Sequence, residues 1–246
     1  MHALDVVAAL LLEQLRCDLD AVFHAREVRI HVERAAPGDV QPVLAPRGID
    51  ASEDELLKWY ARHEAELEAG DYLPYRDILA GALRGLCGEL GFGPSDDEAR
   101  GFAQAIADWP AFHDTAPALC RLGERFRLGV ITNCDRDLFA LSNRRLGVTF
   151  DWVVTAEEAR AYKPSLAPFE LAFATIAVPR DRILHAAQSL FHDHVPADRL
   201  GLTSVWVDRR HHRPGFGATP EASAAPDLTV PDMRTFASVA LEHAPG

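Results

Sequence analysis

Side chains that can bind a ligand follow three short apolar runs in the second half of the chain. Thr132 and Asn133, a hydroxyl and an amide, end the first run. Lys163 follows the second run, and Gln188 and Ser189 end the third. Groups that donate hydrogen bonds or carry positive charge are suited to holding an anion. The spacing therefore predicts a ligand site assembled from separate segments, provided that the three runs lie side by side.

These apolar runs have the length and composition of buried strands. In chain order, the strands and the two helices among them are expected at 127–133, 136–145, 151–155, 166–177, 182–187, 203–207 and 227–230. Continuous apolar strands alternating with helices indicate an α/β fold, here a Rossmann-like core with a mostly parallel sheet covered on both faces. Ligands bind beyond the carboxyl ends of the strands in such sheets, which is where these polar residues stand.

The middle of the chain has a helical pattern instead. Ser52 and Ser95 each precede a glutamate by three residues, which is the capping box that opens a helix. The helices are expected from Ser52 to Gly70, over 75–90, and from Ser95 to about Trp109. Helices without a strand, placed before the α/β half, indicate an inserted helical cap. The expected division is a core of 1–35 and 112–246 with a cap of 36–111.

Composition excludes several classes of function. The formal charge is −12, with 25 Lys and Arg against 37 Asp and Glu, so a nucleic-acid partner is not expected. No apolar run is long enough to cross a membrane. The four cysteines are scattered, which is typical of reduced thiols in a cytoplasmic protein, and the N-terminus shows no secretory signal.

Taken in order, the strand-end segments resemble the motifs of the haloacid dehalogenase superfamily. Ile131-Thr-Asn133 is similar to the second motif, and Ala161-Tyr-Lys-Pro164 to the third. His185-Ala-Ala-Gln-Ser-Leu-Phe-His-Asp193 is similar to the fourth. The resemblance covers roughly residues 48–235 and is nearest to the 2-haloacid dehalogenases. It implies an enzyme, a hydrolase with a small carboxylated substrate under the cap, and relatives of this kind often form homodimers.

The resemblance also implies roles for individual residues. Thr132 and Asn133 would cradle the substrate or the leaving anion, and Lys163 would supply positive charge. Ser189 and Asp193 would support the lysine and position water. Arg62, on the first cap helix, is a candidate to bind the substrate carboxylate.

One departure concerns metal binding. Phosphatases of the superfamily hold Mg²⁺ with the nucleophile and the first acidic residue of the fourth motif, since a hard cation prefers oxygen anions. Gln188 stands at that acidic position here. It favours chemistry without a metal or another cofactor, although a glutamine that only hydrogen-bonds its own loop would look the same.

A second departure concerns the nucleophile, which is an aspartate in the family and forms a covalent ester. An ungapped match places His24 at that position, directly after a strand at 19–23. A histidine cannot form this ester, but a neutral ring can act as a general base. A shifted match makes Asp18 the nucleophile and Asp20 its acid/base partner, and it needs a buried strand at 12–17.

Three hypotheses follow from these patterns. The first is a metal-independent, dehalogenase-like hydrolase redirected by His24 to acid/base chemistry such as elimination, cyclisation or hydration. The second is a Mg²⁺-dependent phosphatase that uses Asp18 and Asp20 together with Asp193. The third is a non-catalytic relative that only binds a small acid.

Overall fold

A computed structural model describes residues 21–25, 39–211, 213 and 215–243 of the chain. These residues form a six-stranded parallel sheet with the order β3-β2-β1-β4-β5-β6. Its strands are β1 (Ala21–Ala25), β2 (Arg127–Thr132), β3 (Trp152–Thr155), β4 (Ile183–Ala187), β5 (Thr203–Val207) and β6 (Leu228–Val230). The α/β fold with a mostly parallel sheet is confirmed, and each expected strand of the second half is present to within one residue of its predicted bounds.

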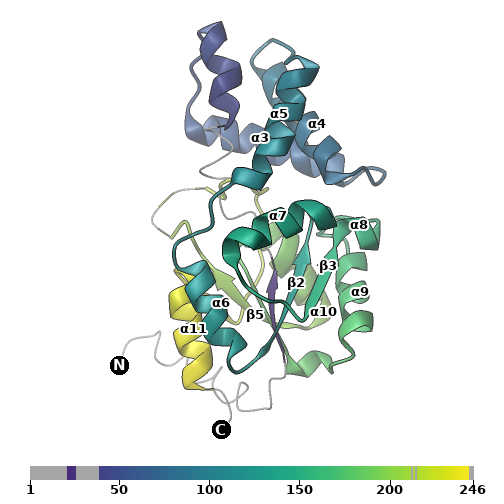
Figure 1. The fold of residues 1–246 in the computed structure, drawn as a ribbon, viewed down its shortest axis with the longest axis vertical. Helices are drawn as coiled ribbons and strands as arrows, with labels where there is room; N and C mark the ends of the chain where they lie inside the picture. Colours follow the sequence, from purple (N-terminus) through teal and green to yellow (C-terminus); the bar gives the residue numbers. More distant parts are fainter. Residues whose placement is uncertain (1–20, 26–38, 212, 214, 244–246) are drawn as a thin grey trace.

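Helices cover both faces of this sheet (Figure 1). They are α6 (Thr115–Gly123), α7 (Arg136–Leu146), α8 (Ala156–Ala159), α9 (Ala167–Ile176), α10 (Val195–Leu200) and α11 (Met233–Glu242). Successive residues of a strand point to opposite faces. Ile183 therefore packs in the cluster that contains α9, whereas Leu184 packs with α6 and α11. Strands that are apolar on both faces are buried on both, as the sequence predicted.

The first strand differs from its expected position. The interpretation that placed His24 at the nucleophile position expected a strand at 19–23, but β1 spans Ala21–Ala25. That expectation was therefore two residues too early, and His24 lies inside the strand instead of after it. The register explains the shift, because all five residues of β1 pair with β4, from Ala21 with Ile183 to Ala25 with Ala187.

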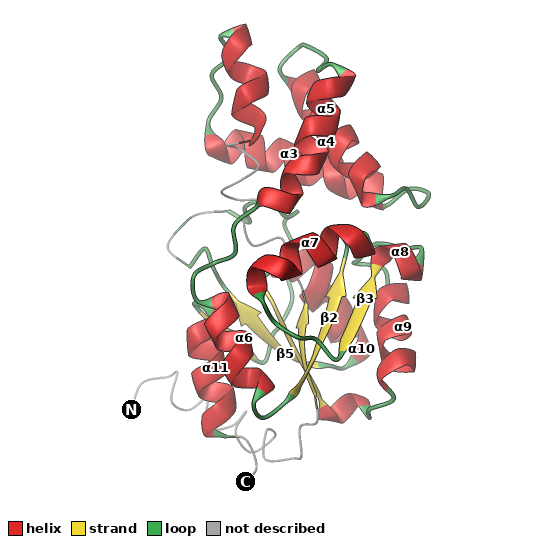
Figure 2. Ribbon diagram, in the orientation of Figure 1, coloured by secondary structure: helices red, strands yellow, loops and turns green. Residues whose placement is uncertain are grey.

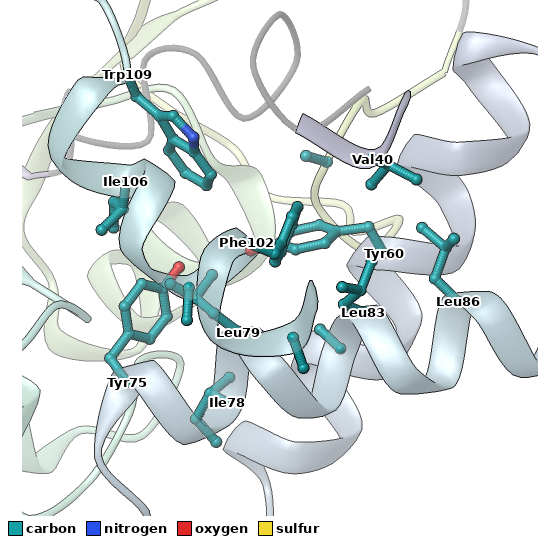
Figure 3. Close-up of a cluster of buried hydrophobic side chains, with 14 of the residues drawn as sticks. Val40, Tyr60, Tyr75, Ile78, Leu79, Leu83, Leu86, Phe102, Ile106 and Trp109 are labelled. Atoms are coloured by element: carbon teal, nitrogen blue, oxygen red, sulfur yellow. The ribbon is translucent and has the colours of Figure 1, made fainter. Parts of the chain in front are cut away.

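A layer of helices stands over the carboxyl ends of the strands (Figure 2). It contains α3 (Glu53–Glu68), α4 (Tyr75–Glu89) and α5 (Asp96–Ala105), followed by a 3-10 turn at Ile106–Asp108. Both predicted capping boxes are present, at Ser52 and Ser95. The apolar faces of these helices meet in a shared cluster that includes Tyr60, Leu79, Leu83 and Phe102 (Figure 3). We call this layer the cap.

The cap is fixed to the core where α4 begins. The residue before α4 is Pro74, whose side chain cannot cap the helix. Asp135 of the core does so instead, since both of its carboxylate oxygens lie 3.0 Å from the backbone nitrogen of Tyr75, which donates to them. Burial raises the pKa of Asp135, although this bond opposes the rise. The core thus supplies the N-terminal cap that the sequence of α4 lacks.

No described helix combines the length and the apolar character that crossing a bilayer requires.

Candidate active site

Lys163 lies at the centre of the polar residues beyond the strand ends. Its side chain is fully buried, and its Nζ donates to Asp193 Oδ1 at 2.5 Å and to the Ile131 carbonyl at 2.9 Å. Asp193 is fully buried as well. Removing two charges from water is costly, and only close pairing with further hydrogen bonds offsets that cost. The Lys163–Asp193 pair therefore ties the third motif to the fourth.

Asn133 connects the second motif to the third. Its Oδ1 accepts a hydrogen bond from the Lys163 backbone N–H at 2.9 Å, and its Nδ2 donates to the Lys163 carbonyl at 3.2 Å. The neighbouring Thr132 is buried, and its Oγ1 accepts from the Cys134 backbone N–H at 3.1 Å. Both residues of this motif are held rigidly, with Asn133 fixing the backbone that carries the lysine.

The fourth motif is helical where the sequence indicated a loop. Leu190–His194 forms a short π-helix between β4 and α10. Ser189 caps it, since its Oγ accepts from the His192 backbone N–H at 3.0 Å. The same Oγ lies 3.0 Å from His192 Nδ1. The π-helix lets both His192 and Asp193 point into the buried site, which a wider loop would not do.

Gln188 lies at the margin of this arrangement. It is half-buried, its backbone carbonyl accepts a hydrogen bond from Trp206 Nε1 at 2.9 Å, and it lines a cavity of about 260 Å³ together with Arg210 and His211. Gln188 thus contacts Trp206 of β5 through its backbone and lines a cavity beside the segment after β5.

Two further histidines lie behind the pair. His185 Nε2 is 3.8 Å from Asp193 Oδ1, and its ring packs against Phe169. His194 Nε2 lies 3.0 Å from the Ala187 carbonyl, and its Nδ1 lies 3.2 Å from Ser204 Oγ. Burial lowers the pKa of His194 below its ordinary value of 6.5. A neutral ring in this position donates to Ala187 and accepts from Ser204.

Replacing His194 with Gln is expected to reduce the loss of folding stability that occurs as the pH falls below about 6.5. Because the folded-state pKa lies below the unfolded one, the unfolded chain binds more protons below about pH 6.5, and stability falls as the pH falls. Each unit of that pKa difference corresponds to about 1.4 kcal/mol. The free energy of unfolding, measured in urea between pH 7.5 and 5.5, should change less with pH for His194→Gln than for the wild type. The same pH dependence in both proteins would contradict this prediction. His113→Gln, at an exposed position, is the control.

Glu68, at the end of α3, reaches the site from the cap. Its Oε1 accepts from Asn133 Nδ2 at 2.9 Å, and its Oε2 lies 3.2 Å from His192 Nε2. The sequence analysis missed this residue. A signal was present, because Glu64 and Glu68 fall on the same helical face as the buried Leu57 and Ala61. Acidic residues on an apolar helix face are rarely buried without a specific partner.

Two cavities flank Glu68. The larger, of about 760 Å³, lies between α3 and the segment 210–221 and includes Arg62 and Phe191 in its lining. Arg62 is half exposed there and pairs with Glu89 of α4. The smaller cavity, of about 390 Å³, is lined by Glu68, Phe191 and residues on either side of Lys163, namely 160–162, 164 and 165. Both cavities lie at the boundary of the cap and the core.

The first motif is described only in part. His24 is the fourth residue of β1, and its backbone pairs in register with Ala186 of β4. Asp18 and Asp20 lie outside the described residues. The position between β2 and β4 is filled by β1. The Asp18 interpretation and its strand at 12–17 concern residues outside the described part of the chain, so that interpretation stays a prediction.

The described donors do not fit a magnesium ion. Gln188 offers a neutral amide where a carboxylate would be needed, and Asp193 Oδ1 already accepts a hydrogen bond from the Lys163 ammonium. Within the described ranges, no group of three or more His, Cys, Asp or Glu side chains is arranged to hold a metal. Mg²⁺ prefers several carboxylate or water oxygens around it, and a lysine ammonium in that shell opposes it.

The comparison with known proteins finds curated 2-haloacid dehalogenases among the relatives of this chain. No family model matches the chain. The (S)-2-haloacid dehalogenase H-109 of Pseudomonas putida is 28% identical over 168 residues, which cover 67% of this chain and 72% of that protein. Haloacetate dehalogenase H-2 of Moraxella sp. (strain B) is 26% identical over 167 residues, with 67% and 72% covered.

A solved structure shows the same fold. The L-2-haloacid dehalogenase of Xanthobacter autotrophicus, with chloropropionic acid covalently bound, has a TM-score of 0.73 at 20% identity and covers 90% of this chain and 98% of that one. The curated relatives and solved structures that this chain resembles are 2-haloacid dehalogenases, and the motif order and the buried Lys163–Asp193 pair agree with that likeness.

Proposed function

We propose that the chain is a metal-independent hydrolase that acts on a small 2-substituted carboxylic acid at the boundary of the cap and the core. The observation that carries the proposal is the buried Lys163–Asp193 pair, held beside Asn133 at the carboxyl ends of β2 and β4. The curated relatives act on 2-haloacids and haloacetate, as their names state. A positive centre at the strand ends suits both a carboxylate substrate and a departing halide.

The nucleophile is the part of the reaction that differs from the relatives. We infer that His24 replaces the aspartate and acts as a general base toward water. Water oxygen then bonds to C2 of the substrate, the C2–halogen bond breaks with its electrons leaving as halide, and the water proton passes to His24. The products are the 2-hydroxy acid, halide and a proton. No covalent ester forms in this route, because an imidazole cannot supply the carboxylate oxygen.

The residues around Lys163 would hold the charges and dipoles that stabilise the substrate and the departing halide in fixed positions. Asn133 and Thr132, held by hydrogen bonds to neighbouring backbone, would orient the carboxylate or the leaving halide. Asp193 keeps the lysine ammonium in place, so no reorganisation is needed when charge develops on the halide. Arg62, in the lining of the larger cavity, would attract the substrate carboxylate.

Halide release tests the proposal directly. Purified protein incubated with (S)-2-chloropropionate, 2-bromopropionate and chloroacetate is expected to release halide with an unchanged rate after excess EDTA. Product formed in ¹⁸O-labelled water should carry the label in a single turnover, because the oxygen comes from water and not from a protein carboxylate. An unlabelled first product would contradict the His24 route.

The two competing hypotheses predict different results in the same experiment. A phosphatase would release phosphate from p-nitrophenyl phosphate with Mg²⁺ and lose that activity in EDTA. A non-catalytic relative would bind a 2-halo acid in calorimetry and return it unchanged. Either result, without halide release, would overturn the proposed function.

A further inference from the structure

Glu68 joins two motifs of the core from a position in the cap. One carboxylate oxygen accepts a hydrogen bond from Asn133 Nδ2 at 2.9 Å, in the second motif. The other oxygen lies 3.2 Å from His192 Nε2, in the fourth motif. The side chain is 2% exposed, and His192 is fully buried. A carboxylate needs hydrogen-bond donors or a positive charge when it is buried, and here the core supplies them.

The two partners of Glu68 lead on to the rest of the site. Asn133 is hydrogen-bonded at both its oxygen and its nitrogen to the Lys163 backbone. His192 Nδ1 lies 3.0 Å from Ser189 Oγ, which caps the π-helix that carries Asp193. Displacing Glu68 would therefore remove a contact from Asn133, which holds the Lys163 backbone, and from His192, which precedes Asp193.

We propose that Glu68 is a positioning residue through which the cap holds the active site in place. Its carboxylate fixes the Asn133 amide and the His192 ring. Without this carboxylate, both side chains lose the same partner. This proposal rests on the proposed function, because it assumes that the same cleft is the active site. It concerns the positions of side chains, which can be measured without turnover.

Glu64 provides a matched control on the same helix. It lies one turn before Glu68, is fully buried, and accepts hydrogen bonds from Tyr60 at 3.0 Å and Tyr75 at 2.7 Å, both in the cap. Glu64→Gln therefore changes a buried carboxylate that accepts from two cap tyrosines. Glu68→Gln changes one that accepts from Asn133 of the core. A difference between the two variants at Asn133 reports on the Glu68–Asn133 contact.

The first measurement is the side-chain amide of Asn133 by NMR. In the wild type, one amide proton faces a carboxylate and is expected downfield and slow to exchange with water. Glu68→Gln keeps only a neutral oxygen as acceptor, so the Asn133 amide proton should resonate less far downfield. Glu68→Ala should abolish it and speed exchange at least tenfold. Glu64→Gln should match the wild type.

The second measurement is the distance between cap and core. Cys120 is exposed on α6, whereas Cys87 and Cys134 are buried, so spin labels on Cys120 and on Arg100→Cys of α5 report the separation in a Cys17→Ser background. With Glu68 intact, we expect a single narrow distribution of the distance between the two labels. Glu68→Ala should make this distribution at least twice as wide. Glu64→Gln should not broaden it.

The outcomes separate this proposal from the proposed function. An Asn133 amide and a label distance that are unchanged in Glu68→Ala would overturn the positioning role, as would equal effects of Glu64→Gln and Glu68→Gln. Should Glu68→Ala not fold, the isosteric Glu68→Gln decides by the amide shift alone. A wild type that releases no halide would count against the proposed function and leave these two measurements unaffected.

Discussion

Replacing Lys163 with Met is expected to slow halide release by about 10²–10³-fold and to destabilise the protein by about 3–5 kcal/mol. Methionine matches the length of the lysine side chain but leaves the fully buried Asp193 without its ammonium partner. Breaking a buried ion pair from one side is costly because the remaining charge cannot reach water. Loss of one charged group that stabilises the transition state lowers kcat by about 10²–10³-fold. Urea unfolding and halide release measure the two effects.

Two variants make this result specific. Lys58→Met changes the other lysine of the chain, which is exposed on α3, and should leave stability within about 0.5 kcal/mol of the wild type. Lys163→Met combined with Asp193→Leu should recover most of the lost stability, since an apolar pair can replace a buried ion pair, but no activity. A Lys163→Met protein that keeps its activity would remove the lysine from the mechanism.

Replacing His24 with Ala is expected to lower kcat for the 2-halo acid by about 10²–10⁴-fold, the usual contribution of a general base. The loss should be accompanied by loss of the acid limb of the pH–rate profile, because the base must be neutral to accept a proton. An unchanged circular dichroism spectrum would show that the overall secondary structure is retained. His113→Ala, at an exposed position before α6, is the control. Full activity in His24→Ala would refute the role that we assign to this residue.

The converse substitution tests the same idea from the other side. His24→Asp supplies the carboxylate that the superfamily uses as its nucleophile. We expect this variant to incorporate ¹⁸O into a protein carboxylate during turnover in labelled water, which the wild type should not do. Mass spectrometry of the peptide that contains residue 24 gives the result. The absence of label in an active His24→Asp variant would show that this position does not face the substrate.

The sheet and the central lysine were predictable from the sequence because their signals are local. Runs such as 127–133 and 203–207 are apolar throughout, and only a strand that is buried on both faces requires that pattern. Lys163 lies in the segment that follows β3 and α8, and the carboxyl ends of parallel strands share one edge. The placement of Asn133 beside it followed from the same rule.

Other parts were not predictable because they depend on distant residues. Glu68 is 65 positions from Asn133 and belongs to another layer, so no spacing rule connects them. The π-helix at Leu190–His194 is set by the Ser189 cap and by burial, whereas propensity alone does not distinguish it from a loop. The first strand was placed two residues too early because 19–25 has no clear alternation, and its pairing with β4 decides its bounds.

The place of β1 in the sheet has a consequence for synthesis of the chain on the ribosome. This strand is the earliest of the described strands, yet Ala21 pairs with Arg127 on one side and with Ile183 on the other. Translation at about 5–20 residues per second separates Ala21 from Ile183 by roughly 8–32 s. Until Ile183 has been made, the edge of β1 that pairs with β4 lacks its partner strand, and an unpaired strand edge is a template for aggregation. Additional chaperone during expression should therefore raise the yield of folded protein.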